Sequence, residues 1–319
     1  MRRPVYLSVL PLLLAFAVAG SQLLQAQEPE SVGKSSARMT VTLRVQGKNK
    51  QTPEVRSNDV IVKQGKTVLP VTRWTPARGE SAGLDLFILL DDASDSSVAL
   101  QFDELRAFIK AQPESTLIGV GYMRNSTVAI AQNFTSDHDQ AAKSLRLPFG
   151  NSGAFGNSYL SVVNLINRWP INGNRREIVM ITDGIDRRHD VYHRRGLGFI
   201  SPDVYSASHA AQHTGTVIDT IYTQGVGRWS RNYWKITNGQ TNLAKLSDAT
   251  GGESYFLGAH NAVSFRPYLD EIHNALANQY LLEFDAVPRK KPGVHYISLD
   301  TPVAGVELDS AEGVWVGSR

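Results

Sequence analysis

Cysteine is absent from this 319-residue chain, so no disulfide bridge stabilises the fold and no lipid can be attached through an N-terminal cysteine. An excess of charge of one sign is also missing, because 33 basic residues stand against 30 acidic ones. No internal repeat is visible, which argues against a solenoid or a propeller. Hydrophobic residues make up 42% and charged residues 20% of the chain, ordinary values for a globular protein with one large domain, or one large and one small.

Apolar runs long enough to interact with a membrane are confined to the N-terminus. Arg2 and Arg3 precede an apolar stretch over residues 7–20, and polar residues follow Ala26. This layout is typical of a secretory signal peptide cleaved after Ala26. The apolar stretch is shorter than the ~20 residues that a bilayer span needs, so we expect no retained span. The sequence therefore predicts export to the periplasm or the extracellular space.

Cleavage would also bring the chain close to electrical neutrality. Residues 1–26 hold two arginines and no acid, so the mature chain has 31 basic and 30 acidic residues. Such a balance provides no general attraction for phosphate backbones, and we expect no nucleic-acid partner.

The remaining chain falls into four segments by composition and pattern. Residues 27–38 are polar and predict a linker, and residues 39–80 predict a small β region with a hairpin turn near Gly65. Residues 81–280 alternate strands with helices, and residues 281–319 return to β-structure. We expect 281–319 to pair with 39–80 as a small β-sandwich element.

The alternating segment predicts an α/β fold with a doubly wound, mostly parallel sheet and helices on both faces. Residues 84–90 are almost continuously apolar, which is typical of a strand buried on both faces. The expected strands are 84–90, 116–122, 127–134, 177–182, 216–222 and 254–256, and the expected helices are 98–109, 136–145, 158–168, 202–213, 241–249 and 267–278.

Oxygen-bearing side chains follow the buried strands, at the edge where open α/β sheets bind ligands. Asp92, Ser94 and Ser96 come after the first of these strands, and Asp183 comes after the fourth. Ser158 stands between them at the start of a helix. Carboxylate and hydroxyl ligands suit Mg²⁺, or Mn²⁺ or Ca²⁺, rather than zinc. Few carboxylates in such a set would leave the ion able to bind an Asp or Glu carboxylate of a protein partner.

These residues resemble the metal-ion-dependent adhesion site (MIDAS) of von Willebrand factor A (VWA) domains. The pattern comprises Asp92-x-Ser94-x-Ser96, a Gly-x-Ser at 156–158 and Thr182-Asp183-Gly184. The resemblance covers about residues 84–280, and its tail is similar to the VWA-related proteins of acidobacteria. It implies a VWA/Rossmann-like fold, a magnesium site, and a role in cell adhesion or protein–protein interaction rather than an enzymatic one.

The pattern also departs from the family. Ser158 stands where the family usually has threonine, and it lacks the methyl group that restrains the threonine rotamer. Asp91 and Asp95 add charge beside the triplet, where they could tighten the ion or compete for it. A vestigial, metal-free VWA domain therefore stays open as an alternative.

Two loops on the same expected face are rich in arginine and aromatic residues. Residues 186–199 and 225–240 each follow a strand and should border the metal site. Exposed arginine with tryptophan and tyrosine is typical of recognition hot spots, and it would also suit a carbohydrate or an envelope component. The predicted partner-binding residues are Arg187, Arg188, Tyr192, Arg194, Arg195, Arg228, Trp229, Arg231, Tyr233 and Trp234.

Two other function classes compete with the binding module. A metal-dependent hydrolase or phosphoryl-transfer enzyme is one, because the acidic pair Asp91–Asp92 at a strand end also occurs in such α/β proteins. Against it, the sequence offers no evident nucleophile–base pair, and export would separate the chain from cytoplasmic phosphate donors. A metal-free structural subunit of an envelope assembly is the other.

Overall fold

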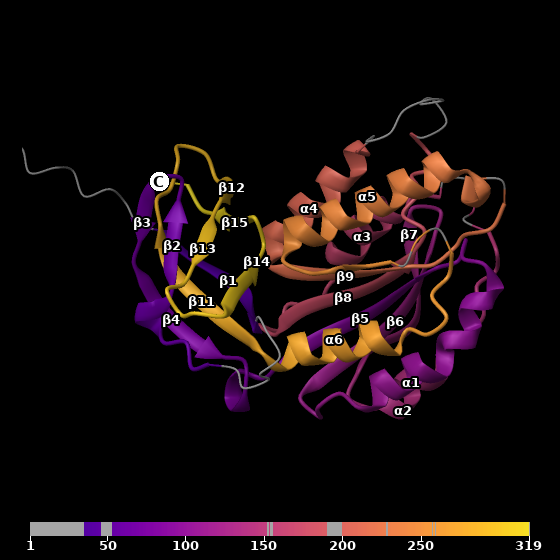
Figure 1. The fold of residues 1–319 in the computed structure, drawn as a ribbon, viewed down its shortest axis with the longest axis horizontal. Coiled ribbons are helices and arrows are strands. Elements are labelled where there is room, and N and C mark those ends of the chain that lie inside the picture. Colours follow the sequence, from indigo (N-terminus) through magenta and orange to yellow (C-terminus); the bar gives the residue numbers. More distant parts are fainter. Residues whose placement is uncertain are drawn as a thin grey trace, which may run out of the picture. The chain divides into compact units, whose positions relative to one another are not determined.

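The computed structural model of the chain describes residues 35–45, 53–151, 153, 156–189, 200–227, 229–256, 258 and 260–318, apart from the side chains of Glu80 and Trp229 (Figure 1). The predicted signal peptide (1–26) and most of the predicted linker lie outside the described residues. Within these ranges, no helix has the length and apolar character needed to cross a membrane.

The α/β domain is built on one six-stranded sheet with the order β10-β9-β8-β5-β6-β7. Its strands are β5 (Leu84–Asp91), β6 (Thr116–Arg124), β7 (Thr127–Thr135), β8 (Arg175–Thr182), β9 (Thr216–Tyr222) and β10 (Ser254–Tyr255). All neighbours pair in parallel except β7, which runs antiparallel to β6. Counted along the chain from β5, this is the doubly wound order 3-2-1-4-5-6. The predicted fold class is confirmed.

Helices cover both faces of this sheet. They are α1 (Phe102–Lys110), α2 (His138–Lys143), α3 (Ser158–Ile166), α4 (Pro202–Thr214), α5 (Tyr233–Thr250) and α6 (Arg266–Ala277), with short 3-10 helices η1 (Ser57–Asp59), η2 (Gly79–Ser81), η3 (Ser96–Gln101) and η4 (Trp229–Arg231). Figure 1 shows α3, α4 and α5 on one side and α1, α2 and α6 on the other.

Strand β5 feeds two separate hydrophobic cores because its side chains alternate between the two faces. Leu86 and Leu90 lie in the core with residues of α1, α2 and α6. Phe87 and Leu89 lie in the other, with residues of α3, α4 and α5. Both faces of this strand are therefore packed against helices.

A β element joins the two ends of the described chain. Its main sheet has the order β14-β1-β11-β4, and smaller sheets have the orders β13-β2-β3 and β12-β15. The strands are β1 (Ser35–Val45), β2 (Ile61–Gln64), β3 (Thr67–Leu69), β4 (Val71–Pro76), β11 (Gln279–Ala286), β12 (Gly293–Tyr296), β13 (Ser298–Asp300), β14 (Val306–Ser310) and β15 (Gly313–Val316). Residues from all three sheets share one hydrophobic core. The N- and C-terminal segments thus pair in one β element, as predicted from the sequence.

Helix α5 is longer than the sequence pattern indicated. It begins at Tyr233, because the Asn232 side chain caps its first turn by accepting hydrogen bonds from the backbone N–H groups of Trp234 and Lys235 at 3.0 and 3.3 Å. Gly239, the seventh residue of this helix, weakens the helical signal. The predicted recognition loop 225–240 therefore ends at Asn232, and η4 (Trp229–Arg231) lies within it.

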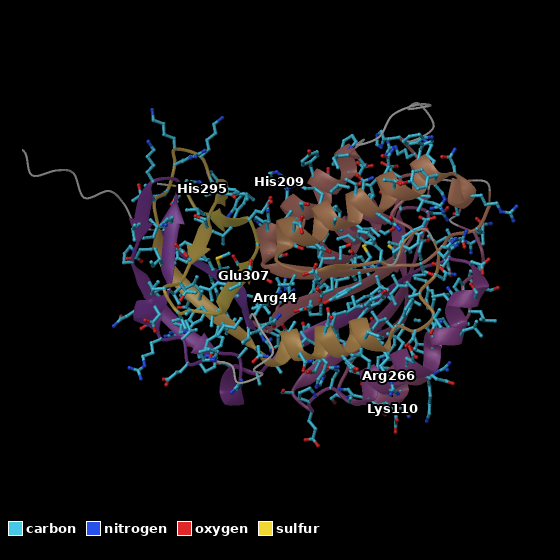
Figure 2. All side chains as sticks on the ribbon, viewed as in Figure 1. Arg44, Lys110, His209, Arg266, His295 and Glu307 are labelled. Atoms are coloured by element: carbon cyan, nitrogen blue, oxygen red, sulfur yellow. The ribbon has the colours of Figure 1, made fainter. Side chains whose placement is uncertain are left out.

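The β element borders the amino ends of the parallel strands. Gln279, the first residue of β11, accepts a hydrogen bond from Arg175 at the start of β8 and donates one to Glu177 at 2.8 Å. Arg44 of β1, labelled in Figure 2, pairs with Glu253 just before β10 at 3.1 Å. The carboxyl ends of β5, β8 and β9 are at the opposite end of their strands, and we call the residues there the carboxyl rim.

Two acidic side chains are buried together near these amino ends. Asp219 of β9 is 4% exposed, and its Oδ2 atom has no hydrogen-bond partner within the described part of the chain. Burial raises the pKa of the Asp219 carboxyl well above its ordinary value, and the adjacent Glu177 raises this pKa further. We expect this pair to make the stability of the fold depend on pH.

Candidate functional site at the carboxyl rim

Asp91, the last residue of β5, occupies the centre of the carboxyl rim. Its Oδ2 atom accepts hydrogen bonds from Thr182 Oγ1 at 2.7 Å and Ser158 Oγ at 3.1 Å, while its Oδ1 atom accepts one from the backbone N–H of Ala93 at 2.8 Å. The three segments that the sequence predicted to meet do converge here. They meet around Asp91, however, and not around Asp92.

Asp92 is held elsewhere, which corrects the predicted ligand set. Its fully buried carboxylate binds both terminal nitrogens of Arg146, at 2.7 and 3.0 Å, and accepts the backbone N–H of Phe149 at 3.3 Å. The Arg146 guanidinium lies over the rings of Tyr122 and Phe149, 3.7 and 4.0 Å from their centroids. Consecutive strand residues point to opposite faces, so Asp91 and Asp92 cannot both face Ser158.

The two predicted serine ligands are also placed apart from Ser158. Ser94 is 2% exposed and forms an antiparallel bridge with Gly225. Ser96 is exposed and begins η3, whose cap is Asp95. Measured from Asp91, the position that corresponds to Ser94 in the predicted triplet is Ala93, which carries no oxygen ligand. The structure therefore does not bring Asp92, Ser94 and Ser96 together with Ser158 and Asp183.

Asp183, which follows β8, is paired with a positive charge from its own loop. Arg187 Nη2 lies 2.5 Å from Asp183 Oδ2, and Arg187 Nη1 lies 3.2 Å from Oδ1. Ser230 Oγ donates to the same Oδ2 atom at 3.2 Å, and the backbone N–H of Ile185 donates to Oδ1 at 3.0 Å. Both carboxylate oxygens of Asp183 are thus fully engaged.

Burial and charge at this pair act in opposite directions on the ionisation of the side chains. Burial alone would lower the pKa of the Arg187 guanidinium, but Asp183 and Asp91 together raise it above its ordinary value. Burial raises the pKa of the Asp91 carboxyl, and the Arg187 charge limits that rise. Arg187 therefore stays protonated and serves both acids.

A short ladder between two loops covers the Arg187–Asp183 pair. Asp95 donates its backbone N–H to Gln224 at 2.8 Å, and Val226 donates its own to Ala93 at 2.8 Å. Gly225 stands between them, and a Cβ atom at this position would meet Asp183 Oδ2, as well as Arg187 Nη2 at 2.8 Å. Only glycine allows the backbone to approach the ion pair this closely.

These donors do not fit the divalent ion that the resemblance implied. Asp91, Ser158, Thr182 and Asp183 would have to give up their hydrogen bonds, and a doubly charged ion would face the Arg187 guanidinium. Two positive charges that bind the same buried carboxylates repel each other strongly. The rim as folded is an ion pair with hydroxyl donors, and an ion could enter it only by displacing Arg187.

A second polar cluster lies beside the first and could hold a metal ion. Ligand atoms of Asp186, His189 and Asp203 lie within 4.8 Å of one another. His189 Nδ1 is 2.9 Å from Asp186 Oδ2 and 3.3 Å from Asp203 Oδ2, and Asn157 Nδ2 contacts both acids. Burial raises the pKa of the Asp203 carboxyl, and Asp186 adds to that rise. The sequence pattern did not reveal this cluster, because Asp186 and His189 lie in the 186–199 loop whereas Asp203 lies in the first turn of α4.

The predicted partner-binding residues are only partly described. Arg187 is mostly buried, with a side chain 14% exposed, so it belongs to the site's interior. Arg188, Arg231, Tyr233 and Trp234 are exposed. Outside the described residues lie Tyr192, Arg194, Arg195, Arg228 and the side chain of Trp229.

The connection from α2 to α3 adds two apolar side chains to this rim that the sequence analysis did not single out. Leu147 and Phe149 are 59% and 61% exposed, although Phe149 donates its backbone N–H to buried Asp92. A Cβ atom at Gly150 would lie 3.7 Å from Val226, so this connection adjoins the loop after β9. The sequence signal that could have indicated them is a leucine and a phenylalanine between two predicted helices.

No protein-family model matches the sequence, and no curated protein matches it. Similar solved structures include an aerotolerance-related membrane protein from Bacteroides fragilis and the conserved hypothetical protein BatB from Bacteroides thetaiotaomicron. Each has 12% identity and a TM-score of 0.44, covering 61% of this chain and 98% of that one. The SpRpn10 VWA domain has 9% identity and a TM-score of 0.37, covering 59% of this chain and 94% of that one. These weak likenesses carry no argument of their own. The VWA-like fold rests on the strand order, and the resemblance to acidobacterial proteins stays a prediction.

Proposed function

We propose that this chain is an exported binding module that holds an acidic group of a protein partner at the carboxyl rim. The supporting observation is the composition of that rim. Exposed Tyr233 and Trp234 follow exposed Arg231, and exposed Phe149 lies on the connection from α2 to α3. Asp92 and Asp183 at this rim are paired within the chain. Aromatic side chains with arginine are the residues that contribute most to protein–protein binding energy.

The binding experiment compares variants at the two ends of the sheet. Envelope extracts are passed over immobilised chain, and the captured partner is isolated and titrated against Trp234→Ala and Phe149→Ala. If these side chains are hot spots, each change should weaken binding by about 30-fold, which corresponds to about 2 kcal/mol.

Matched controls come from outside the rim. Trp315→Ala on β15 removes a tryptophan that is 37% exposed, and Ile171→Ala removes a side chain that is 97% exposed in the segment before β8. Both should leave the affinity unchanged. Equal losses in rim and control variants would show that general apolar adhesion, and not this rim, retains the partner.

Export is tested separately from binding. When the full chain is produced in a bacterium with a secretion pathway, the protein outside the cytoplasm should begin at Gln27. Mass spectrometry of the intact protein decides this, because retention of residues 1–26 would contradict a cleaved signal peptide.

The Asp186–His189–Asp203 cluster favours a second candidate, the metal-dependent enzyme. Two carboxylates and one imidazole can bind a catalytic divalent ion. Turnover of a generic phosphate or ester substrate that His189→Gln abolishes would support this candidate. Absence of such turnover in the presence of Mg²⁺, Mn²⁺ or Zn²⁺ would remove this candidate.

A further inference from the structure

A metal-dependent rim needs a cation between the acids that end β5 and follow β8, and Arg187 already supplies one. Its guanidinium binds both oxygens of Asp183, at 2.5 and 3.2 Å, and its charge also acts on Asp91. The loop around Gly225 closes over this pair. The positive charge is therefore part of the folded chain.

Few protein oxygens are also free at this rim, and a divalent ion bound here would have to keep several of its waters. Ala93 offers no hydroxyl two residues after Asp91, and Asp95 uses its carboxylate to accept the backbone N–H of Ser97 at 2.9 Å. The remaining hydroxyls of Ser158 and Thr182 both bond to Asp91. Mg²⁺ demands six well-placed ligands and gives up its water reluctantly, so it would not readily displace a bidentate arginine.

A second arginine, Arg124, lies at the same place. Arg124 lines a small pocket of about 10 Å³ together with Asp91, Ser158 and Arg187. Its Nε atom is buried and has no hydrogen-bond partner among the described residues. A pocket of this volume holds about one oxygen atom. An acceptor oxygen that reached this buried N–H would satisfy it.

We propose that Arg187 takes the place of the divalent ion in this chain, so that the rim receives a partner's carboxylate oxygen through Arg124 and needs no metal. The role of Arg124 rests on the proposed binding function. The replacement of the ion by Arg187 does not, and it can be tested on the full chain alone.

The test measures the melting temperature and Mn²⁺ binding of four forms: wild type, Asp183→Asn, Arg187→Gln, and Arg187→Gln with Asp183→Asn. Wild type should show the same melting temperature in EDTA and in millimolar Mg²⁺. Electron paramagnetic resonance should detect the same amount of bound Mn²⁺ in wild type and in Asp183→Asn. Arg187→Gln leaves two carboxylates and two hydroxyls without their cation, so Mg²⁺ should raise its melting temperature. The second substitution should abolish that gain.

One result overturns the inference: Mg²⁺ raises the melting temperature of wild type, and Asp183→Asn removes the rise. A rise that His189→Gln removes and Asp183→Asn preserves belongs to the neighbouring cluster and leaves the inference standing. If Arg187→Gln does not fold, the wild-type titration decides alone, and Arg187→Lys, which keeps the charge, should fold and ignore Mg²⁺.

The Arg124 contact is tested with the isolated partner in EDTA. Binding should persist in EDTA and should fall at least tenfold in Arg124→Gln, while the matched change Arg176→Gln at the start of β8 has no effect. Undiminished binding by Arg124→Gln would refute the contact. Absence of any captured partner would refute the proposed function but leave the metal titration decisive.

Discussion

The Asp92–Arg146 pair offers the sharpest test of the corrected rim. Arg146→Ala would leave a fully buried carboxylate without its cation, since both bonds to Asp92, at 2.7 and 3.0 Å, disappear. Breaking one side of a buried ion pair costs about 3–5 kcal/mol. The Arg146 side chain is itself 34% exposed, so water can reach Asp92 from that side and the lower figure is appropriate. We therefore expect a loss of about 3 kcal/mol in the free energy of unfolding.

Urea unfolding followed by tryptophan fluorescence measures this loss, and the chain has five tryptophans. Asp92→Asn combined with Arg146→Ala should cost less than Arg146→Ala alone, because a neutral amide tolerates burial better than an unpaired carboxylate. Arg106→Ala is the matched control. Its partner Asp103 is 97% exposed, so its loss should cost at most about 1 kcal/mol.

Two outcomes would refute this account of Asp92. Arg146→Ala and Arg106→Ala could prove equally mild, which would mean that the Asp92 carboxylate is solvated. Alternatively, Mg²⁺ could restore the stability of Arg146→Ala, which would return Asp92 to the role of a metal ligand.

Two further predictions concern pH and packing. Because burial raises the pKa of Asp219, the native state keeps a proton that the unfolded chain releases, so the stability this group provides is full in acid and is lost as the pH rises through its native pKa. Asp219→Asn should therefore gain stability relative to wild type between about pH 5 and pH 8, and a constant difference in urea midpoints would contradict this. Gly239→Ala should destabilise the fold despite alanine's better helix propensity, since its Cβ would meet the Asp183 carbonyl oxygen; a higher urea midpoint would show that the contact relaxes.

The sequence was sufficient to predict the sheet, but not which of the two acids at the end of β5 faces Ser158. Apolar runs and caps such as Ser201 before α4 located the strands and helices well. The two adjacent acids after β5 were indistinguishable, because that strand is apolar on both faces and gives no sign of which residues share a side. A shift of one residue moved Asp92 to the opposite face and placed Asp91 against Ser158.

The pairing of Arg146 and Arg187 with buried acids could not be predicted from the sequence for a different reason. Arg146 stands 54 residues from Asp92, and its role depends on a connection folding back over β5. Arg187 stands four residues after Asp183, a spacing that could have suggested pairing, yet the same arginine also fitted an exposed recognition loop. Local pattern cannot say whether such a side chain turns inward, since that choice depends on the closing ladder around Gly225.

Two of the rim acids follow one rule. Asp92 is paired with Arg146 and Asp183 with Arg187, so each of them has a cationic partner from the chain itself. A site neutralised in this way exerts little pull on a free divalent ion, and it is already ordered before any partner arrives. Affinity must then come from the side chains around it, such as those of Phe149, Arg231 and Trp234, which are exposed. Chelators should consequently leave partner binding intact, whereas loss of a rim aromatic should not.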